Sequence, residues 1–240
     1  ALMARLPFRD IVVQDRFAQE HNILVLEARG LKSYHHQAGA MMRIAARAQV
    51  PLAVAEDAEV VMFRAEIGGE DHFAVLIGKG TELEAPLVRL HSQCITGDVL
   101  GSLKCDCGDQ LQAAMRLMAE NGGGVLIYLA QEGRDIGLLN KMRAYALQDN
   151  GLDTVDANHA LGFDTDERVF LPAARILDAL GITRLRLITN NPDKISQLEQ
   201  CGIKVEERVP LSLASNPHNE DYLATKKHRT GHMIADKDKG

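Results

Sequence analysis

Three of the chain's four cysteines, Cys94, Cys105 and Cys107, fall within residues 89–111 at a Cys-x10-Cys-x-Cys spacing. If the last two lie on a strand, their side chains point to the same side, and the glycines before them allow a turn that brings Cys94 back. Three converging thiolates suit a tetrahedral zinc ion and leave its fourth position open, as catalytic zinc sites do. The alternative is that the cysteines are small buried hydrophobic residues.

A possible phosphate site follows further along the chain. The segment Thr189-Asn-Asn-Pro-Asp-Lys194 places a hydroxyl, free helix amides and a lysine where a predicted strand gives way to a helix. Oriented N–H groups at a helix N-terminus attract phosphate, and the lysine adds a full charge. Ordinary helix capping explains the same residues equally well.

Two more polar segments carry possible chemistry. Glu132, Gly133 and Arg134 directly follow an apolar strand, which is a favoured ligand position in α/β sheets. A carboxylate there can accept hydrogen bonds from a guanine N1–H and amine, although a surface ion pair is the simpler interpretation. Asp166 and Arg168 lie in an acidic loop before a helix, where helix-dipole effects explain the acid but not the arginine.

The elements that must position these groups change character along the chain. Residues 38–50 are rich in alanine and arginine and predict a helix that stops before Pro51. Residues 59–67 and 72–78 predict a β-hairpin, with the next strand at 88–91. The first half of the chain therefore predicts an antiparallel sheet.

In the second half, helical and strand periods alternate. Helices are predicted at residues 110–120, 136–147, 170–180 and from Asn191 onward, with strands at 125–130, 184–189 and 204–209. This alternation indicates a mixed α/β (α+β) fold arranged around the zinc site. We expect residues 1–52 to be an extension, 53–217 the catalytic domain, and 218–240 a loop-rich, partly disordered tail.

Composition limits the class of protein. A hydrophobic content of 46% and a charged content of 25% are ordinary for a globular protein. No apolar run approaches the roughly 18 residues of a membrane span, so we expect no membrane association. A formal charge of −6 argues against nucleic-acid binding. Four cysteines in a metal-like pattern favour the reducing cytoplasm over a secreted disulfide framework.

Several long motifs in order resemble the GTP cyclohydrolase II family. The match covers about residues 88–217, and its motifs are Arg89-Leu-His-Ser-Gln-Cys-Ile-Thr-Gly-Asp, Cys105-Asp-Cys-Gly, Gln131-Glu-Gly-Arg, Ile136-Gly-Leu-Leu-Asn-Lys-Met-Arg-Ala-Tyr-Ala-Leu-Gln-Asp, Asp166-Glu-Arg and Thr189-Asn-Asn-Pro. Residues 18–52 are weakly similar to the junction of bifunctional proteins that also carry a dihydroxybutanone-phosphate synthase domain. The catalytic part of that domain is absent, so no synthase activity is expected.

The resemblance implies a hydrolase that opens the guanine ring of GTP, releasing formate and pyrophosphate, at the start of riboflavin synthesis. It implies one zinc per chain on Cys94, Cys105 and Cys107, magnesium with the pyrophosphate group, and a homodimer. In the family, the counterpart of Arg168 is the proposed nucleophile on the α-phosphorus, with Asp166 as proton acceptor, and Tyr145 acts at the base. The implied GTP contacts are Arg89, Leu90, His91, Ser92, Gln93, Gln110, Glu132, Gly133, Arg134, Thr154, Thr189 and Lys194.

The chain departs from the usual family pattern at Gln93, Ala130 and Val169, where glutamate, arginine and an acid are common. None of these changes removes a predicted metal ligand or catalytic group. Two other functions stay open: a related enzyme that stops at the formamide product, and a non-catalytic regulatory protein that binds zinc or nucleotide. A nucleobase deaminase is disfavoured because its His-x-Glu and Pro-Cys-x-x-Cys pattern is missing.

Overall fold

The computed structural model describes residues 11–23, 42–65, 70–211, 213, 215–229, 231 and 233. The chain divides into two units, Ala1–Gln37 and Ala38–Gly240. In the first unit the described part is helix α1 (Ile11–Glu20), which is followed by a turn. The second unit contains the sheet, the remaining described helices and every predicted site residue.

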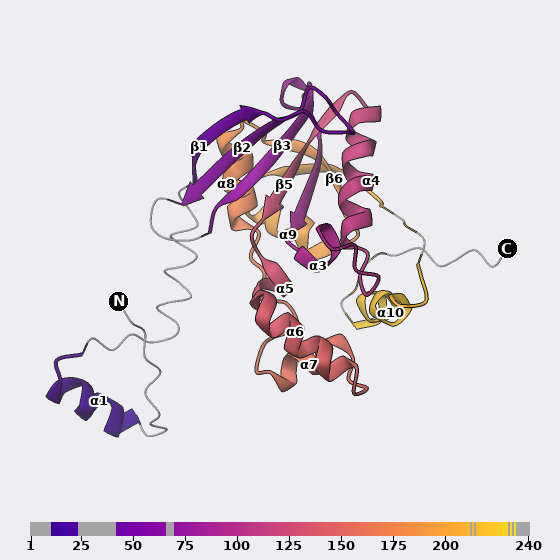
Figure 1. Ribbon diagram of the computed structural model, residues 1–240. Coiled ribbons are helices and arrows are strands. Elements are labelled where there is room, and N and C mark those ends of the chain that lie inside the picture. Colours follow the sequence, from indigo (N-terminus) through magenta and orange to yellow (C-terminus); the bar gives the residue numbers. More distant parts are fainter. Residues whose placement is uncertain are drawn as a thin grey trace. The chain divides into compact units, whose positions relative to one another are not determined.

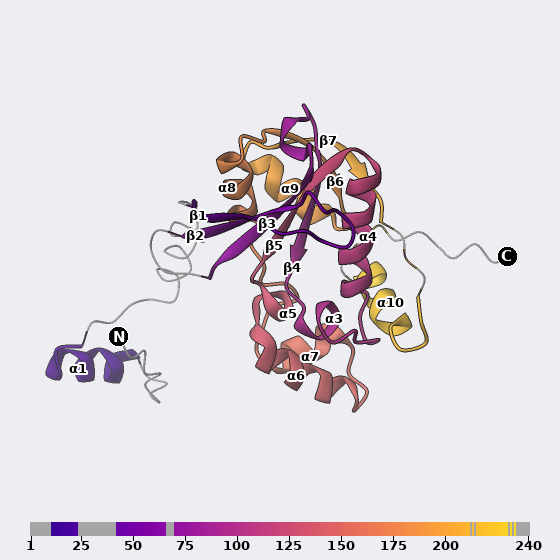
Figure 2. The same cartoon turned by 45° about the horizontal axis from the view of Figure 1, so that its top comes forward.

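A seven-stranded mixed sheet organises the second unit, in the order β1-β2-β3-β5-β4-β6-β7 (Figures 1 and 2). Strands β1, β2, β3 and β5 pair antiparallel in turn, whereas β5, β4, β6 and β7 pair parallel. Their bounds are β1 Met42–Gln49, β2 Glu59–Ala65, β3 His72–Gly78, β4 Leu87–Ser92, β5 Gly123–Leu129, β6 Arg184–Ile188 and β7 Lys204–Val209. The predicted mixed fold is confirmed, but β4 pairs parallel, so the first half is only partly antiparallel.

Helices cover both faces of the sheet. Helix α4 (Cys107–Glu120) packs on one face, and α8 (Leu171–Ala179) and α9 (Pro192–Gln200) pack on the other. Successive side chains of β3 alternate between the two faces of the sheet. Ala74 and Leu76 face α8 and α9, while Val75 and Ile77 face α4. Burial on both faces explains why the central strands are nearly continuous apolar runs.

Short helices gather beyond the carboxyl ends of β4 and β5 (Figures 1 and 2). They are α3 (Ile95–Asp98), α5 (Glu132–Asp135), α6 (Gly137–Gln148) and α7 (Thr154–Ala160). A 3-10 turn at Gly80–Glu82 and helix α10 (Glu220–Arg229) complete the described elements. Helix α10 lies within the tail, residues 218–240, for which the sequence predicts loops. Two ion pairs from Arg229, to Asp153 and Asp156, tie this helix to α7.

Two further predictions were wrong. Residues 42–49 form strand β1 instead of a helix, because their pairing with β2 overrides the helix propensity of alanine and arginine. The first residues of that predicted helix lie outside the described residues. Cys105 and Cys107 do not share a strand either, since Cys105 lies in a loop and Cys107 begins α4.

Candidate active site

The candidate active site lies at the carboxyl ends of three adjacent parallel strands. Strand β4 leads into Gln93 and Cys94, β5 into residues 131–134, and β6 into Thr189. Parallel strands end at the same edge of a sheet, so segments far apart in sequence meet there. One pocket at this edge is lined by most of the predicted site residues: Arg89, His91, Ser92, Gln93, Cys94, Cys105, Cys107, Gln110, Gly133, Arg134, Tyr145, Thr154, Arg168, Thr189 and Lys194.

The three cysteines meet in this pocket. Their sulfur atoms lie within 4.8 Å of one another, and the Sγ atoms of Cys94 and Cys105 are 3.7 Å apart. Two sulfurs bound at about 2.3 Å to a tetrahedral zinc would be roughly 3.8 Å apart, so the spacing fits that metal. Cys94 and Cys105 are buried and Cys107 is partly exposed. Hydrogen bonds from the neighbouring thiols, and then from Lys141, hold the pKa of Cys94 far below that of a free thiol.

Two glycines permit the cysteines to converge. A Cβ on Gly97 would lie 2.9 Å from Cys105 Sγ and 3.2 Å from Cys94 Sγ, and a Cβ on Gly108 would lie 2.4 Å from the carbonyl oxygen of Gly97. Helices α3 and α4 therefore approach so closely that only hydrogen fits at both positions. Of the two glycines that the predicted turn relied on, Gly97 serves close packing, whereas Gly101 has a φ of 66°, a left-handed backbone that suits a turn.

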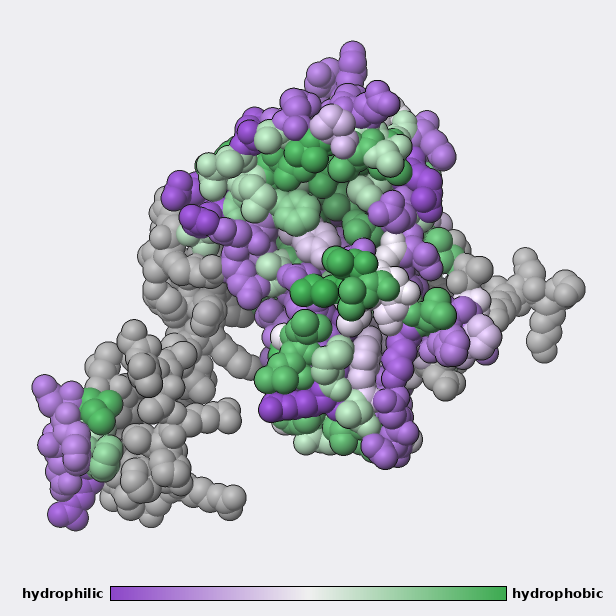
Figure 3. Space-filling model, in the orientation of Figure 1, coloured by the Kyte–Doolittle hydropathy of each residue, from purple (hydrophilic) through white to green (hydrophobic). Residues whose placement is uncertain are grey.

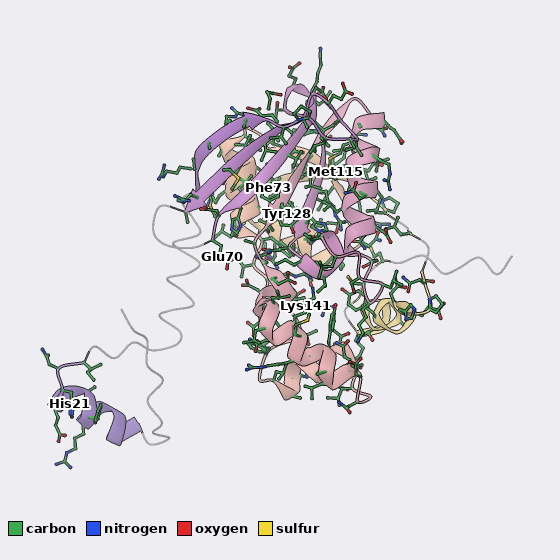
Figure 4. The ribbon with its side chains drawn as sticks, viewed as in Figure 1. His21, Glu70, Phe73, Met115, Tyr128 and Lys141 are labelled. Carbon is green, nitrogen blue, oxygen red and sulfur yellow. The ribbon has the colours of Figure 1, made fainter. Side chains whose placement is uncertain are left out.

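Asp98 fixes the backbone on which Cys94 sits. Its Oδ2 atom accepts hydrogen bonds from the amide of Cys94 at 3.0 Å and from the Tyr128 hydroxyl at 2.8 Å. The Nε2 atom of His91 lies 3.1 Å from both carboxylate oxygens. Burial lowers the pKa of His91, although the hydrogen bond to Asp98 opposes this shift. Figure 4 shows Tyr128 beside Phe73, and the two rings stack at 4.7 Å.

Cationic side chains surround the rest of the pocket. Arg89 and His91 lie on the α4 face of β4 because strand residues alternate, and Arg89 donates to Ile188 O and to Gln110 Oε1. The buried Lys194 donates to Leu90 O at 2.7 Å. Arg168 reaches in from the loop before α8. This concentration of positive charge suits a polyanionic ligand.

Arg168 and Asp166 form a bidentate ion pair. Arg168 Nε and Nη2 donate to the two carboxylate oxygens at 2.8 and 2.5 Å. Burial opposes both charges, but their mutual hydrogen bonds outweigh it, so the pKa of Asp166 is lowered and that of Arg168 is raised. Asp166 lines an adjacent hollow with Asp164 and Asp193.

Residues 133–135 have an unusual backbone at the edge of the pocket. Gly133, Arg134 and Asp135 all have positive φ angles, of 64°, 61° and 72°. Such a conformation is strained for the two residues that carry a side chain. Arg134 Nη1 donates to Thr165 O at 3.1 Å, which holds the loop before Arg168. Strain of this kind is concentrated at ligand sites.

Two predicted GTP contacts do not line this pocket. Leu90 points to the opposite face of β4 and is 1% exposed in the core beneath α8 and α9. Glu132 already uses both carboxylate oxygens, since Oε2 accepts from the Ile95 amide at 2.7 Å and Oε1 from Lys141 Nζ at 2.8 Å. Only the backbone carbonyl of Leu90 reaches the site, through Lys194.

Sequence reasoning missed several polar side chains that line the pocket, among them Lys141 and Tyr222. Lys141 precedes Tyr145 by four residues on α6, so the helical period already placed both on one face. Two lysines lie near the ring of Tyr145, with Lys104 Nζ 5.1 Å and Lys141 Nζ 5.8 Å from its centroid. Burial raises the pKa of Tyr145. Tyr222 comes from α10, and nothing in its local sequence signals a site.

Comparison with known proteins identifies relatives of the chain. Residues 42–210 match the family model described as GTP cyclohydrolase II. A GTP cyclohydrolase-2 from Shigella boydii is 54% identical over 166 residues, covering 69% of this chain and 85% of the relative. One from Azotobacter vinelandii is 54% identical over 172 residues, covering 72% and 83%.

A longer relative extends beyond this match. The GTP cyclohydrolase-2 of Azospirillum brasilense is 52% identical over 218 residues, which is 91% of this chain but 57% of the relative. An alignment of that length must include part of residues 1–41, before the family match begins. A solved two-domain 3,4-dihydroxy-2-butanone 4-phosphate synthase from A. baumannii aligns with 85% of this chain and 50% of its own, at 17% identity and a TM-score of 0.43.

None of the described helices is both long enough and apolar enough to span a membrane.

Proposed function

The chain belongs to the GTP cyclohydrolase II family, and we propose that it hydrolyses GTP with release of formate from C8 and of pyrophosphate. The product is 2,5-diamino-6-(5-phosphoribosylamino)pyrimidin-4(3H)-one, from which riboflavin is made. One observation carries the proposal: three thiols and three cations, Arg89, Arg168 and Lys194, line the same pocket. The thiols suit a metal that activates water, and the cations suit a triphosphate.

Zinc is the proposed metal, held by Cys94, Cys105 and Cys107. The sulfur spacing and the soft donor set support this choice over magnesium or calcium, which prefer oxygen. The chemistry that a bound zinc supplies is a water whose pKa is lowered toward about 7, available at neutral pH for attack on C8. A reducing cytoplasm, where thiols stay free of disulfides, is the proposed setting.

Arg168 acts on the phosphate end of the substrate in this proposal. A guanidinium held protonated by Asp166 is a poor nucleophile, and the raised pKa of Arg168 makes it poorer still. We therefore assign it stabilisation of charge on the α-phosphoryl group as pyrophosphate leaves, with Asp166 fixing its orientation. Intact-mass analysis of quenched enzyme in a single turnover should detect no phosphoryl-arginine adduct. A stoichiometric adduct would show instead that Arg168 attacks the α-phosphorus as a nucleophile.

The remaining pocket residues would bind and orient GTP. The backbone and side chains of Ser92, Gln93, Gln110, Gly133, Arg134, Thr154 and Thr189 are the proposed contacts, together with His91, and Mg²⁺ would accompany the pyrophosphate group. Tyr145 would act at the base during ring opening. Formate release distinguishes this reaction from one that stops at the formamide, because only complete hydrolysis gives one formate per pyrophosphate.

A homodimer is the proposed assembly. Figure 3 shows hydrophobic side chains gathered over α3 and α6, where Val99, Leu100, Leu103 and Leu139 are 58–74% exposed. Monomeric proteins rarely expose contiguous apolar patches of this kind. Sedimentation should show Leu139→Asp shifted toward monomer, whereas Leu83→Asp, at an exposed leucine outside this patch, should leave the dimer intact. A wild-type monomer would refute the assembly.

The decisive experiment incubates the zinc-loaded protein with GTP and magnesium while following diaminopyrimidine absorbance, formate and pyrophosphate. Equal amounts of formate and pyrophosphate are expected. Cys105→Ser should abolish formate release, because it removes a proposed ligand. Cys201→Ser is the matched control, since Cys201 lies outside the pocket at the end of α9 and packs against the core. No turnover of GTP by wild type would refute the proposed function.

A further inference from the structure

Lys141 is a buried lysine whose hydrogen-bonding capacity is fully used beside the cysteine cluster. It lies on α6, facing the carboxyl ends of β4 and β5 (Figure 4), and is 8% exposed. Its Nζ atom donates to Cys94 Sγ at 3.1 Å, Thr96 Oγ1 at 2.9 Å and Glu132 Oε1 at 2.8 Å. An ammonium has three protons, so each finds one acceptor.

These contacts keep the lysine charged in spite of its burial. The carboxylate of Glu132 forms an ion pair with the ammonium at 2.8 Å, and Cys94 Sγ accepts a hydrogen bond from the same nitrogen at 3.1 Å. A buried charge of this kind persists only where it is paired and hydrogen-bonded. One of its partners is a sulfur of the predicted metal site. A lysine with a purely structural role would not need this hydrogen bond to a sulfur.

We propose that Lys141 is a positioning residue for the metal site, which holds the Cys94 thiolate in place and keeps a positive charge beside a zinc bound by three thiolates. This inference rests on the proposed zinc site. Three thiolates and Zn²⁺ carry a net charge of −1, and the ammonium of Lys141 lies against one of the three sulfurs while it also pairs with the Glu132 carboxylate. Groups that hydrogen-bond to metal ligands orient them and tune their affinity for the metal.

Glu132 belongs to the same unit. One of its oxygens accepts from Lys141 and the other from the amide of Ile95, the residue after Cys94. Lys141 and Glu132 therefore hold the Cys94 segment from two directions, at the sulfur and at the backbone. This assigns Glu132 to the support of the metal site, and leaves recognition of the guanine base to other residues.

The test compares Lys141→Met with wild type as zinc-loaded full chain. Chelator competition should show zinc bound about 10- to 100-fold more weakly in the variant, the range typical for loss of a group that supports a metal ligand. Lys104→Met is the matched control, because Lys104 also lies near Tyr145 but is exposed and pairs with Asp149. Its zinc affinity should equal that of wild type.

Cobalt substitution gives a readout that a purely structural role would not move. Loss of a hydrogen bond to a thiolate raises the energy of the sulfur lone pairs, so the sulfur-to-cobalt charge-transfer band of Lys141→Met should shift to longer wavelength. Lys141→Arg, which keeps the charge, should recover part of the zinc affinity. If Lys141→Met does not fold, Glu132→Gln preserves the packing and should weaken zinc binding in the same direction.

The outcomes separate this inference from the function on which it rests. Wild type that binds zinc and turns over GTP, with a folded Lys141→Met of unchanged zinc affinity and cobalt spectrum, would overturn the positioning role alone. Wild type that binds no zinc would overturn both. Weaker zinc binding and a shifted band in Lys141→Met, with Lys104→Met unchanged, would establish the role.

Discussion

Replacing Gly97 by alanine should damage the metal site while leaving most of the fold intact. Gly97 lies in α3, and an alanine Cβ there would stand 2.9 Å from Cys105 Sγ, 3.0 Å from Cys107 Cβ and 3.2 Å from Cys94 Sγ. All three neighbours belong to proposed zinc ligands. The added methyl group can be accommodated only if the sulfurs separate, and zinc tolerates deviations of only about 0.2 Å in its bond lengths.

Two opposing terms set the size of the effect. Alanine is favoured over glycine in a helix by about 1 kcal/mol, whereas an extra methyl group in a packed site costs roughly 1–3 kcal/mol. The free energy of unfolding of the metal-free protein should therefore fall by no more than about 2 kcal/mol. If the strain is expressed mainly in the metal-bound state, 1–3 kcal/mol corresponds to zinc binding about 5- to 150-fold weaker.

Chelator competition measures the affinity, and urea unfolding of the metal-free protein measures the stability. Gly101→Ala is the matched control: Gly101 has φ +66° and nothing within 4 Å of an added Cβ. A left-handed alanine costs about 1–2 kcal/mol of stability, but zinc affinity should not change. If Gly97→Ala bound zinc as tightly as wild type, the close packing inferred for α3 and α4 would be wrong.

Three further predictions concern the same site. Asp98→Ala leaves the Cys94 amide and the Tyr128 hydroxyl without their acceptor. Urea unfolding should show the free energy of unfolding lowered by about 3–5 kcal/mol in this variant, and by about 1 kcal/mol in Tyr128→Phe. Asp166 has a lowered pKa, so its ion pair is complete above the unfolded value of about 3.9 and is lost as pH falls through the folded value. The pH profile of kcat/KM should therefore show no acid limb from Asp166 between pH 5 and 8, and Asp166→Asn should lower kcat/KM across that range. Removal of zinc should expose three thiols to a thiol reagent and leave the reactivity of Cys201 unchanged, which a timed titration of wild type and Cys201→Ser can show.

The sequence predicted well those features that depend on local pattern and strand order. Thr189 and the segment from residue 131 were both placed after strands, and the parallel pairing of β4, β5 and β6 then brings them together with Cys94. The prediction failed where tertiary contacts override local preference. Residues 42–49 were predicted as a helix but pair with β2. Helix α10 was missed because its stabilising ion pairs join it to residues 76 and 73 positions away.

Glu132 shows most clearly why site residues were harder to predict than elements. Its position after β5 was correct, and a carboxylate at a strand end is equally suited to a guanine, an ammonium or a backbone amide. Only tertiary contacts decide among these partners, because they bring Lys141 from α6 and the Ile95 amide from α3 to the two oxygens of the same carboxylate. A motif identifies which residues stand near the chemistry. Such a residue can contact the substrate, or it can support another residue that contacts the substrate. Hydrogen bonds between distant segments decide which, and residue spacing does not reveal them.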